Sequence, residues 1–213
     1  MLSDRAMPGR AADRASLLFG RYLAIVLRLV AKVIVGVLAV VVVALLVGFI
    51  AWDVLVFQAQ RPSIDQLIAS ATEEERNPPE TVVRLVRTEA SQRVASRTYW
   101  VLVGDPTNPT NRAEVVSSLP WQTRRLLWWT CLWLHLSERD QITLIVSRSY
   151  MGQDMTGFSA ASQAVFNRPL ALLSLEEAAT LVAIPHCASC FHNKRKGWDV
   201  RRDYLLSRLQ PDP

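Results

Sequence analysis

Residues 33–52 contain no charged side chain, and this segment limits what the chain can fold into more than any other feature. As a helix, a segment of this length spans about 30 Å, the thickness of the hydrocarbon core of a bilayer. A cleaved signal peptide would have a shorter apolar region followed by a site of small residues, and neither is present. The segment therefore predicts a transmembrane signal anchor that stays on the protein, rather than a buried core helix.

The charges on either side of this anchor predict its orientation. Residues 1–32 carry six basic side chains against two acidic ones, whereas residues 53–80 carry six acidic side chains against two basic ones. Basic residues near a membrane helix are retained on the cytoplasmic side. We therefore expect a basic cytoplasmic leader at 1–32, an acidic juxtamembrane segment at 53–80 and an extracytoplasmic domain at 81–213. In a Gram-negative bacterium this domain would lie in the periplasm, held at the inner membrane.

Local signals after the anchor predict a mostly α-helical protein. Ser174 and Glu177 have the spacing of a capping box, and Pro185 ends the apolar helix that this box opens. Ser137 and Asp140 form a second candidate box. Helical spacing and chain breakers predict further helices at residues 63–75, 81–94, 119–136 and 157–166.

Three stretches have another or an ambiguous pattern. Residues 99–103 fit a short strand, and residues 104–111 are rich in Pro, Asn and Gly and predict a loop. Residues 142–151 are rich in β-branched side chains, so their pattern suits either a helix or a strand.

The predicted helix at 119–136 contains Trp128, Trp129 and Trp133 and is too short to span a bilayer. One interpretation is a helix buried at the centre of the domain, with Cys131 as a buried apolar residue. The other is an interfacial patch in which the tryptophans lie at the level of the lipid headgroups. The sequence leaves both open.

Beyond these local signals, the residues from Leu136 to Pro185 follow an ordered set of motifs. They are Tyr150-Met151-Gly152, Gly157-Phe158-x-x-Ala161, Phe166-x-x-Pro169 and Leu175-x-Glu177-x-Ala179-x-Leu181-x-Ala183-x-Pro185. In order and spacing this resembles the C-terminal half of the family 51 glycosyltransferases, the peptidoglycan transglycosylases of monofunctional enzymes and class A penicillin-binding proteins. The resemblance implies a lysozyme-like, helical glycosyltransferase-type domain behind a single transmembrane helix. It also favours a helix for residues 142–151.

The reaction of this family transfers a sugar from a lipid pyrophosphate, which needs a carboxylate base and cations that stabilise the departing pyrophosphate. Glu89 follows an apolar helical run, as the first catalytic Glu of the family does, but Ala90 stands where an Asp should follow. Arg124 and Arg125 match the cationic pair of another family motif, and its carboxylate position falls on Trp128, or on Arg125 if the chain is aligned without a gap. The Gly-Gly-Ser-Thr-Ile-Thr-Gln-Gln motif has no counterpart.

These departures predict a degenerate family member with impaired or lost catalysis. By resemblance, its partners would be membrane lipid and a lipid-linked peptidoglycan precursor or glycan strand, together with cell-wall synthesis proteins. Arg124, Arg125 and Tyr150 are then the candidate substrate-binding residues, and Glu89 is the candidate general base. The alternative is an active peptidoglycan glycosyltransferase that uses Glu89, for which a divalent metal would be the cofactor. Without activity, no cofactor is predicted.

The stretch His186-Cys187-Ala188-Ser189-Cys190-Phe191-His192 carries side chains that could bind zinc or form a local disulfide. Outside the cytoplasm, a disulfide between Cys187 and Cys190 is one expectation, and free thiols are another. A metal site of His186, Cys187, Cys190 and His192 is a weaker alternative, because a second ligand pair at the usual distance is missing. A membrane-anchored thiol/disulfide or zinc module is therefore a third hypothesis for function.

The net charge of +5 does not indicate nucleic-acid binding. The basic excess lies mostly in the leader and in the last 25 or so residues, and no nucleic-acid motif is present. We therefore expect no nucleic acid among the partners.

Overall fold

The computed structural model of this chain describes residues 9–91, 93–104, 120–186 and 196–209. The contacts within it divide the chain into two compact units, Met1–Ala51 and Trp52–Pro213.

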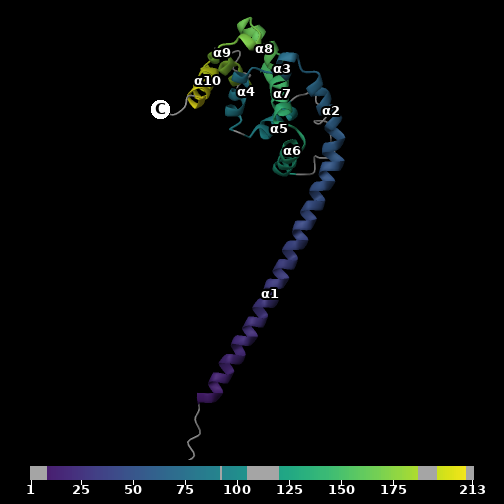
Figure 1. Ribbon diagram of the computed structural model, residues 1–213, viewed down its shortest axis with the longest axis vertical. Helices are drawn as coiled ribbons and strands as arrows, with labels where there is room; N and C mark the ends of the chain where they lie inside the picture. The colour runs from purple at the N-terminus through teal and green to yellow at the C-terminus, as the bar shows by residue number, and fades with distance from the viewer. Residues whose placement is uncertain (1–8, 92, 105–119, 187–195, 210–213) are drawn as a thin grey trace, which may run out of the picture. The chain divides into compact units, whose positions relative to one another are not determined.

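The first unit is formed by α1 (Gly9–Trp52), drawn as a single long helix in Figure 1. Its apolar side chains from Leu27 to Val47 are exposed, for example Leu45, which is 69% accessible. The helical stretch Leu27–Ala69 is long and apolar enough to cross a membrane: its most apolar window has a mean hydropathy of 3.3 and none of that window is buried. Residues 33–52 predict this single N-terminal membrane helix, and the structure agrees in length and composition.

The second unit begins with a π-helix, η1 (Asp53–Phe57), followed by α2 (Gln58–Ala69) and the short α3 (Glu73–Arg76). The helix predicted at 63–75 is therefore interrupted. Thr72 caps α3 and forms a reciprocal capping box with Glu75, so the chain restarts its helix there.

Next come α4 (Glu80–Glu89) and α5 (Val94–Gly104). The single helix predicted at 81–94 is wrong in its second part, because a turn with Ser91 at φ 48° separates the two helices. The strand predicted at 99–103 is also wrong. In α5, the side chains of Tyr99 and Leu102 are buried at helical spacing, so packing outweighs their β propensity.

The helix predicted at 119–136 is present as α6 (Trp121–His135), and α7 (Glu138–Arg148) follows it. The Ser137 hydroxyl accepts a hydrogen bond from the Asp140 backbone N–H at 3.1 Å and caps α7. The helical interpretation of the β-branched stretch is confirmed as far as Arg148, and residues 150 and 151 belong to a strand. The loop predicted at 104–111 lies outside the described residues from position 105 onward.

A small antiparallel hairpin of β1 (Tyr150–Gly152) and β2 (Met155–Thr156) follows α7. The turn residues Gln153 and Asp154 both have positive φ, as a type I′ turn requires. The chain continues through a set of short helices: α8 (Phe158–Phe166), η4 (Leu170–Leu172), α9 (Leu175–Ala183) and α10 (Lys196–Leu209).

The predicted capping box of α9 is confirmed. The Ser174 backbone N–H donates to Glu177 Oε2 at 2.8 Å, and the Ser174 hydroxyl accepts from the Glu177 N–H at 3.2 Å. The helix predicted at 157–166 is present as α8, and Asn167, in the left-handed conformation, ends it.

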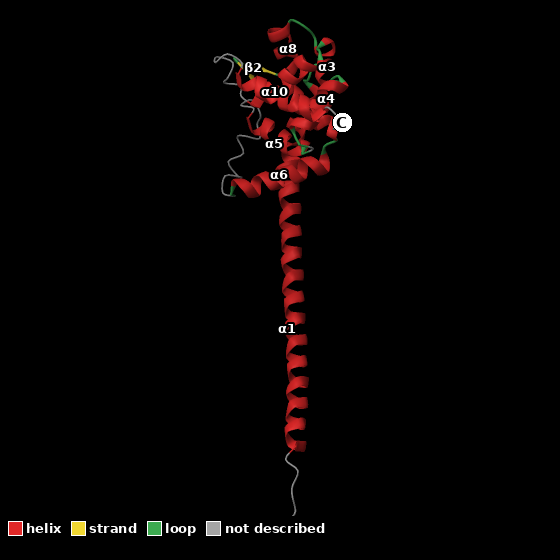
Figure 2. Cartoon of the chain, turned by 90° about the vertical axis from the view of Figure 1, so that its left-hand side faces the viewer, coloured by secondary structure: helices red, strands yellow, loops and turns green. Residues whose placement is uncertain are grey.

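The core of the second unit lies where α4, α9 and α10 pack together and where α5 packs on α6 and α7 (Figure 1). Figure 2 shows this unit as helices with one short hairpin. The predicted mostly α fold is confirmed. Its two helix groups place the end of α4 and the turn after it at the edge of an open groove.

Candidate functional site

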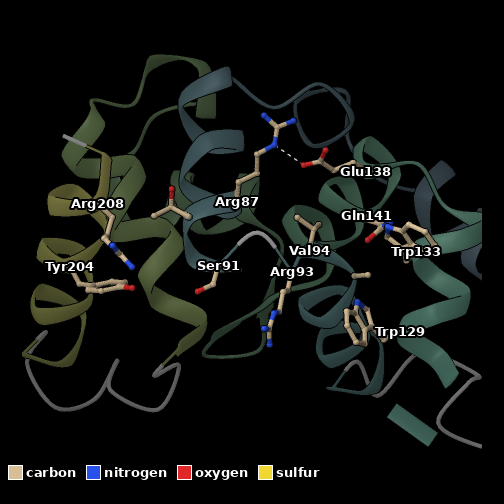
Figure 3. A pocket seen from close by; sticks show the side chains of 12 residues that line it. Arg87, Ser91, Arg93, Val94, Trp129, Trp133, Glu138, Gln141, Tyr204 and Arg208 are labelled. Carbon is tan, nitrogen blue, oxygen red and sulfur yellow. Dashed lines mark hydrogen bonds and ion pairs between the residues drawn. The ribbon is translucent and has the colours of Figure 1, made fainter. Parts of the chain in front are cut away.

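An open groove of about 950 Å³ lies in the second unit. Figure 3 shows it from close by. Side chains from α4, α5, α6, α7 and α10, and from the turn after α4, line it: Arg87, Thr88, Ser91, Arg93, Val94, Ala95, Trp129, Trp133, Glu138, Gln141, Tyr204 and Arg208.

Aromatic rings lie on two sides of this groove (Figure 3). Trp129 and Trp133 are four residues apart on α6 and so share one helix face. Trp133 is 71% exposed, although it lines the groove. Tyr204 lies on α10, on the far side, and the guanidinium carbon of Arg208 is 5.9 Å from its ring centroid. These rings offer flat apolar surfaces that a saccharide or an acyl chain could contact.

Three arginines give the groove its positive charge. Arg87 is compensated, because its Nε donates to Glu138 at 2.7 Å and its Nη1 lies 3.8 Å from Glu80. The hydrogen bond to Glu138 raises the pKa of Arg87. Within the described part of the chain, Arg93 and Arg208 form no ion pair, so their charges are available to an anion.

Glu89 does not line this groove, although Thr88 and Ser91 on either side of it do. Its side chain is only 8% exposed, and its Oε2 accepts hydrogen bonds from two nitrogens of Arg201, with Nε at 2.8 Å. Its Oε1 lies 3.9 Å from His186 Nδ1. Burial lowers the pKa of Arg97, and the nearby Glu89 carboxylate opposes this shift by stabilising the charged guanidinium. The carboxylate of Glu89 is thus enclosed by cationic and imidazole side chains.

The other predicted site residues also lie away from the groove lining. Arg124 and Arg125 are in the first turns of α6, where the Arg125 guanidinium stacks over the Trp121 ring at 5.1 Å. Tyr150 is on β1 and is 51% exposed. Arg93 and Arg208, which do line the groove, lacked a sequence signal, because neither belongs to a motif.

The Trp-rich helix α6 has a buried face and an exposed face. The buried-helix interpretation fits the first, and the exposed tryptophans of the other interpretation lie on the second. Trp128, Cys131 and Leu132 are buried, whereas Trp129 and Trp133 are exposed. Cys131 is a buried free thiol, as predicted.

The predicted disulfide of Cys187 and Cys190 and the alternative metal site lie outside the described residues, apart from His186. Among the residues that the structure describes, no group of three or more His, Cys, Asp or Glu side chains could hold a metal ion.

Comparison with protein families finds a match in the C-terminal part of the chain. Residues 133–210 match the family model for the transglycosylases. The match begins in the last turn of α6 and runs through α10, so it includes β1, α8 and α9, which carry the motifs described above. No curated protein matches the chain. Residues 133–210 therefore match a transglycosylase domain of the family 51 type.

Proposed function

We propose that this protein is a membrane-anchored peptidoglycan glycosyltransferase-like protein that has lost most or all catalysis. It binds a lipid-linked wall precursor or a glycan strand and takes part in cell-wall synthesis through that ligand or through a protein partner. The proposal includes the orientation expected from the charges beside the anchor, with residues 1–32 in the cytoplasm and the domain outside the inner membrane.

The observation that carries the loss of activity is the environment of Glu89. A general base must reach the proton that it removes, directly or through one water. Both the burial of Glu89 and its two hydrogen bonds from Arg201 oppose this, because the lone pairs of Oε2 are already used. The neighbouring groove, where a substrate has room, does not include Glu89.

The observation that supports retained binding is the composition of the groove. Arg93 and Arg208, which form no ion pair with a described residue, can neutralise a pyrophosphate, which has the charge of the leaving group in the family's reaction. Trp129, Trp133 and Tyr204 supply apolar surface for the sugar or the lipid. Binding of this kind does not need a base.

The test uses the full-length protein in nanodiscs with a fluorescent lipid-linked disaccharide pyrophosphate. We expect binding without polymer formation. The Arg93→Gln/Arg208→Gln double variant should bind roughly tenfold or more weakly, because hydrogen bonds to charged groups contribute strongly to binding. Arg84→Gln is the matched control, since Arg84 is exposed on α4 and lies outside the groove lining.

Two results would contradict the proposal. Polymer formation that Glu89→Gln abolishes, in a variant that stays folded, would make the protein an active glycosyltransferase. Equal binding by the double variant and the unchanged protein would place the ligand somewhere other than the groove.

A further inference from the structure

A second hollow, of about 280 Å³, lies beside α3, α4 and α7 and has a different lining from the groove. We call it the arginine pocket, after the three guanidinium groups in its wall. The lining consists of Arg76, Asn77, Pro78, Val83, Arg87, Arg139 and Ile142. No acidic side chain is among them, although acidic residues are frequent in this part of the chain.

Two of the three arginines form ion pairs, Arg76 with Glu73 and Arg87 with Glu138 and Glu80, and these pairs are exposed. Arg76 lies 3.3 Å from Glu73, and Arg87 pairs with Glu138. The side chains in these pairs are between 45 and 75% exposed. Exposed pairs of this kind contribute little to stability, so an incoming anion can compete with them. Arg139 donates to Asn77 Oδ1 and forms no ion pair with any residue that the structure describes.

The remaining wall of the pocket is apolar and selects among anions. Pro78, Val83 and Ile142 contribute no polar side-chain atom, and Ile142 is 3% exposed. A phosphate would turn some of its oxygens toward this wall and lose their hydration without a replacement. A carboxylate has only two oxygens, and the apolar stem behind them can contact the wall.

We propose that the arginine pocket binds a carboxylate attached to a small apolar group, such as the free C-terminus of a short peptide. The guanidinium groups of Arg76 and Arg139 would hold the carboxylate oxygens, since the planar fork of arginine matches a carboxylate in geometry. Asn77 is the uncharged polar residue of the lining, and its Oδ1 accepts a hydrogen bond from Arg139. Arg87 also lines the groove, but the carboxylate would be held by Arg76 and Arg139, so the inference does not depend on the proposed function.

The probe for the test is N-acetylalanine, titrated into the full-length protein in nanodiscs and followed by ligand-observed NMR. The uncharged N-acetylalanine methylamide and inorganic phosphate are titrated in parallel. We expect N-acetylalanine to bind at least tenfold more tightly than either comparison ligand. Arg139→Gln and Arg76→Gln should each weaken its binding roughly tenfold, the effect of losing a charged hydrogen bond. Arg84→Gln, outside the pocket, should leave the affinity unchanged.

Three outcomes would overturn the inference. Equal binding of the methylamide would mean that only the apolar wall recognises the ligand. Tighter binding of phosphate would assign the pocket to a different anion. An equal loss of affinity for N-acetylalanine in Arg84→Gln and Arg139→Gln would mean that general surface charge attracts the ligand. The urea unfolding midpoints of Arg139→Gln and Arg76→Gln are compared with that of the unchanged protein. Equal midpoints show that a loss of affinity does not come from a disturbed fold.

Discussion

Glu75 Oε1 occupies the space that a side chain at Gly157 would need. A β-carbon on Gly157 would lie 2.5 Å from that oxygen and 3.0 Å from the Ser147 carbonyl oxygen. Gly157 also has φ 90°, a conformation that L side chains rarely adopt. The same carboxylate accepts the Ser159 backbone N–H at 3.3 Å and so joins α3 to the first turn of α8.

Gly157→Ala should therefore destabilise the second unit. The positive φ alone should cost about 1–3 kcal/mol, and the contact with Glu75 adds to this. Urea unfolding followed by circular dichroism measures the effect. Gly36→Ala is the matched control, because nothing lies within 4 Å of a side chain there. A Gly157→Ala midpoint equal to that of the control would contradict the strain at this turn.

Removing the partner of Glu89 should also destabilise the fold. Arg201→Met leaves a nearly buried carboxylate without its two hydrogen bonds. Breaking a buried pair typically costs 3–5 kcal/mol. Because the Arg201 side chain is 25% exposed, we expect about 2–4 kcal/mol.

The Glu89→Gln/Arg201→Met double variant tests the cause of that loss. It removes both charges of the pair, so it should be more stable than Arg201→Met alone. Unfolding free energies of the two variants, measured at one pH, provide the comparison. A double variant that is no more stable than Arg201→Met would show that packing of the Arg201 stem, not its charge, holds α10 in place.

The capping box of α9 should make part of the stability pH-dependent. The Ser174 backbone N–H donates to the Glu177 carboxylate and lowers the pKa of Glu177 below its ordinary value of 4.5, and Arg168 adds a smaller effect in the same direction. A lowered pKa in the folded state contributes stability above the unfolded pKa, and this contribution is lost as the pH falls through the folded pKa.

Glu177→Gln should therefore be less stable than the unchanged protein at pH 7, and the difference should shrink as the pH is lowered below 4.5. Thermal unfolding at several pH values measures it. Glu176→Gln serves as the control, because Glu176 is exposed and its side chain caps no helix. A constant difference across the pH range would show that the carboxylate charge has no role in the cap.

Cys131 should resist alkylation in the folded protein. Burial, followed by the nearby Asp53, raises the pKa of its thiol from 9.0 to about 12. The reactive thiolate is therefore nearly absent at pH 8, and the side chain is inaccessible. Maleimide labelling with peptide mass spectrometry should find Cys131 unmodified in the native protein and modified in urea. Stability contributed by the protonated thiol should be lost as the pH rises from 9 toward 12. Rapid native labelling would contradict the buried position.

The sequence predicted the elements whose signals are local. Ser174 with Glu177, and Ser137 with Asp140, identified the starts of α9 and α7, because a capping hydrogen bond joins residues three apart. Thr72 and Glu75 have the same spacing, but the apolar pattern before them extended the predicted helix through the break at residues 70–72. Residues 99–103 were predicted as a strand, since their β-branched and aromatic side chains outweighed a helical burial pattern that only tertiary packing makes visible.

The site could be predicted far less well, because its residues meet only in the folded chain. Glu89 and Arg201 are separated by 112 positions, and no local pattern indicates that they pair. Arg93 and Arg208 likewise come from a turn and from the last helix, and each reads as an ordinary surface cation in the sequence. The family motifs placed the scaffold of α7 to α9 correctly, and scaffold motifs say little about which side chains face a groove.

Arg87 belongs to the walls of both hollows, and this gives the two sites a common element. Arg87 pairs with Glu138 at 2.7 Å, and an anion in either hollow would lie near this shared guanidinium and change the electrostatic environment that the other ligand meets. Thermodynamic linkage then requires that each ligand change the affinity of the other by the same factor. The affinity of the protein for one ligand would thus depend on whether the other ligand is bound.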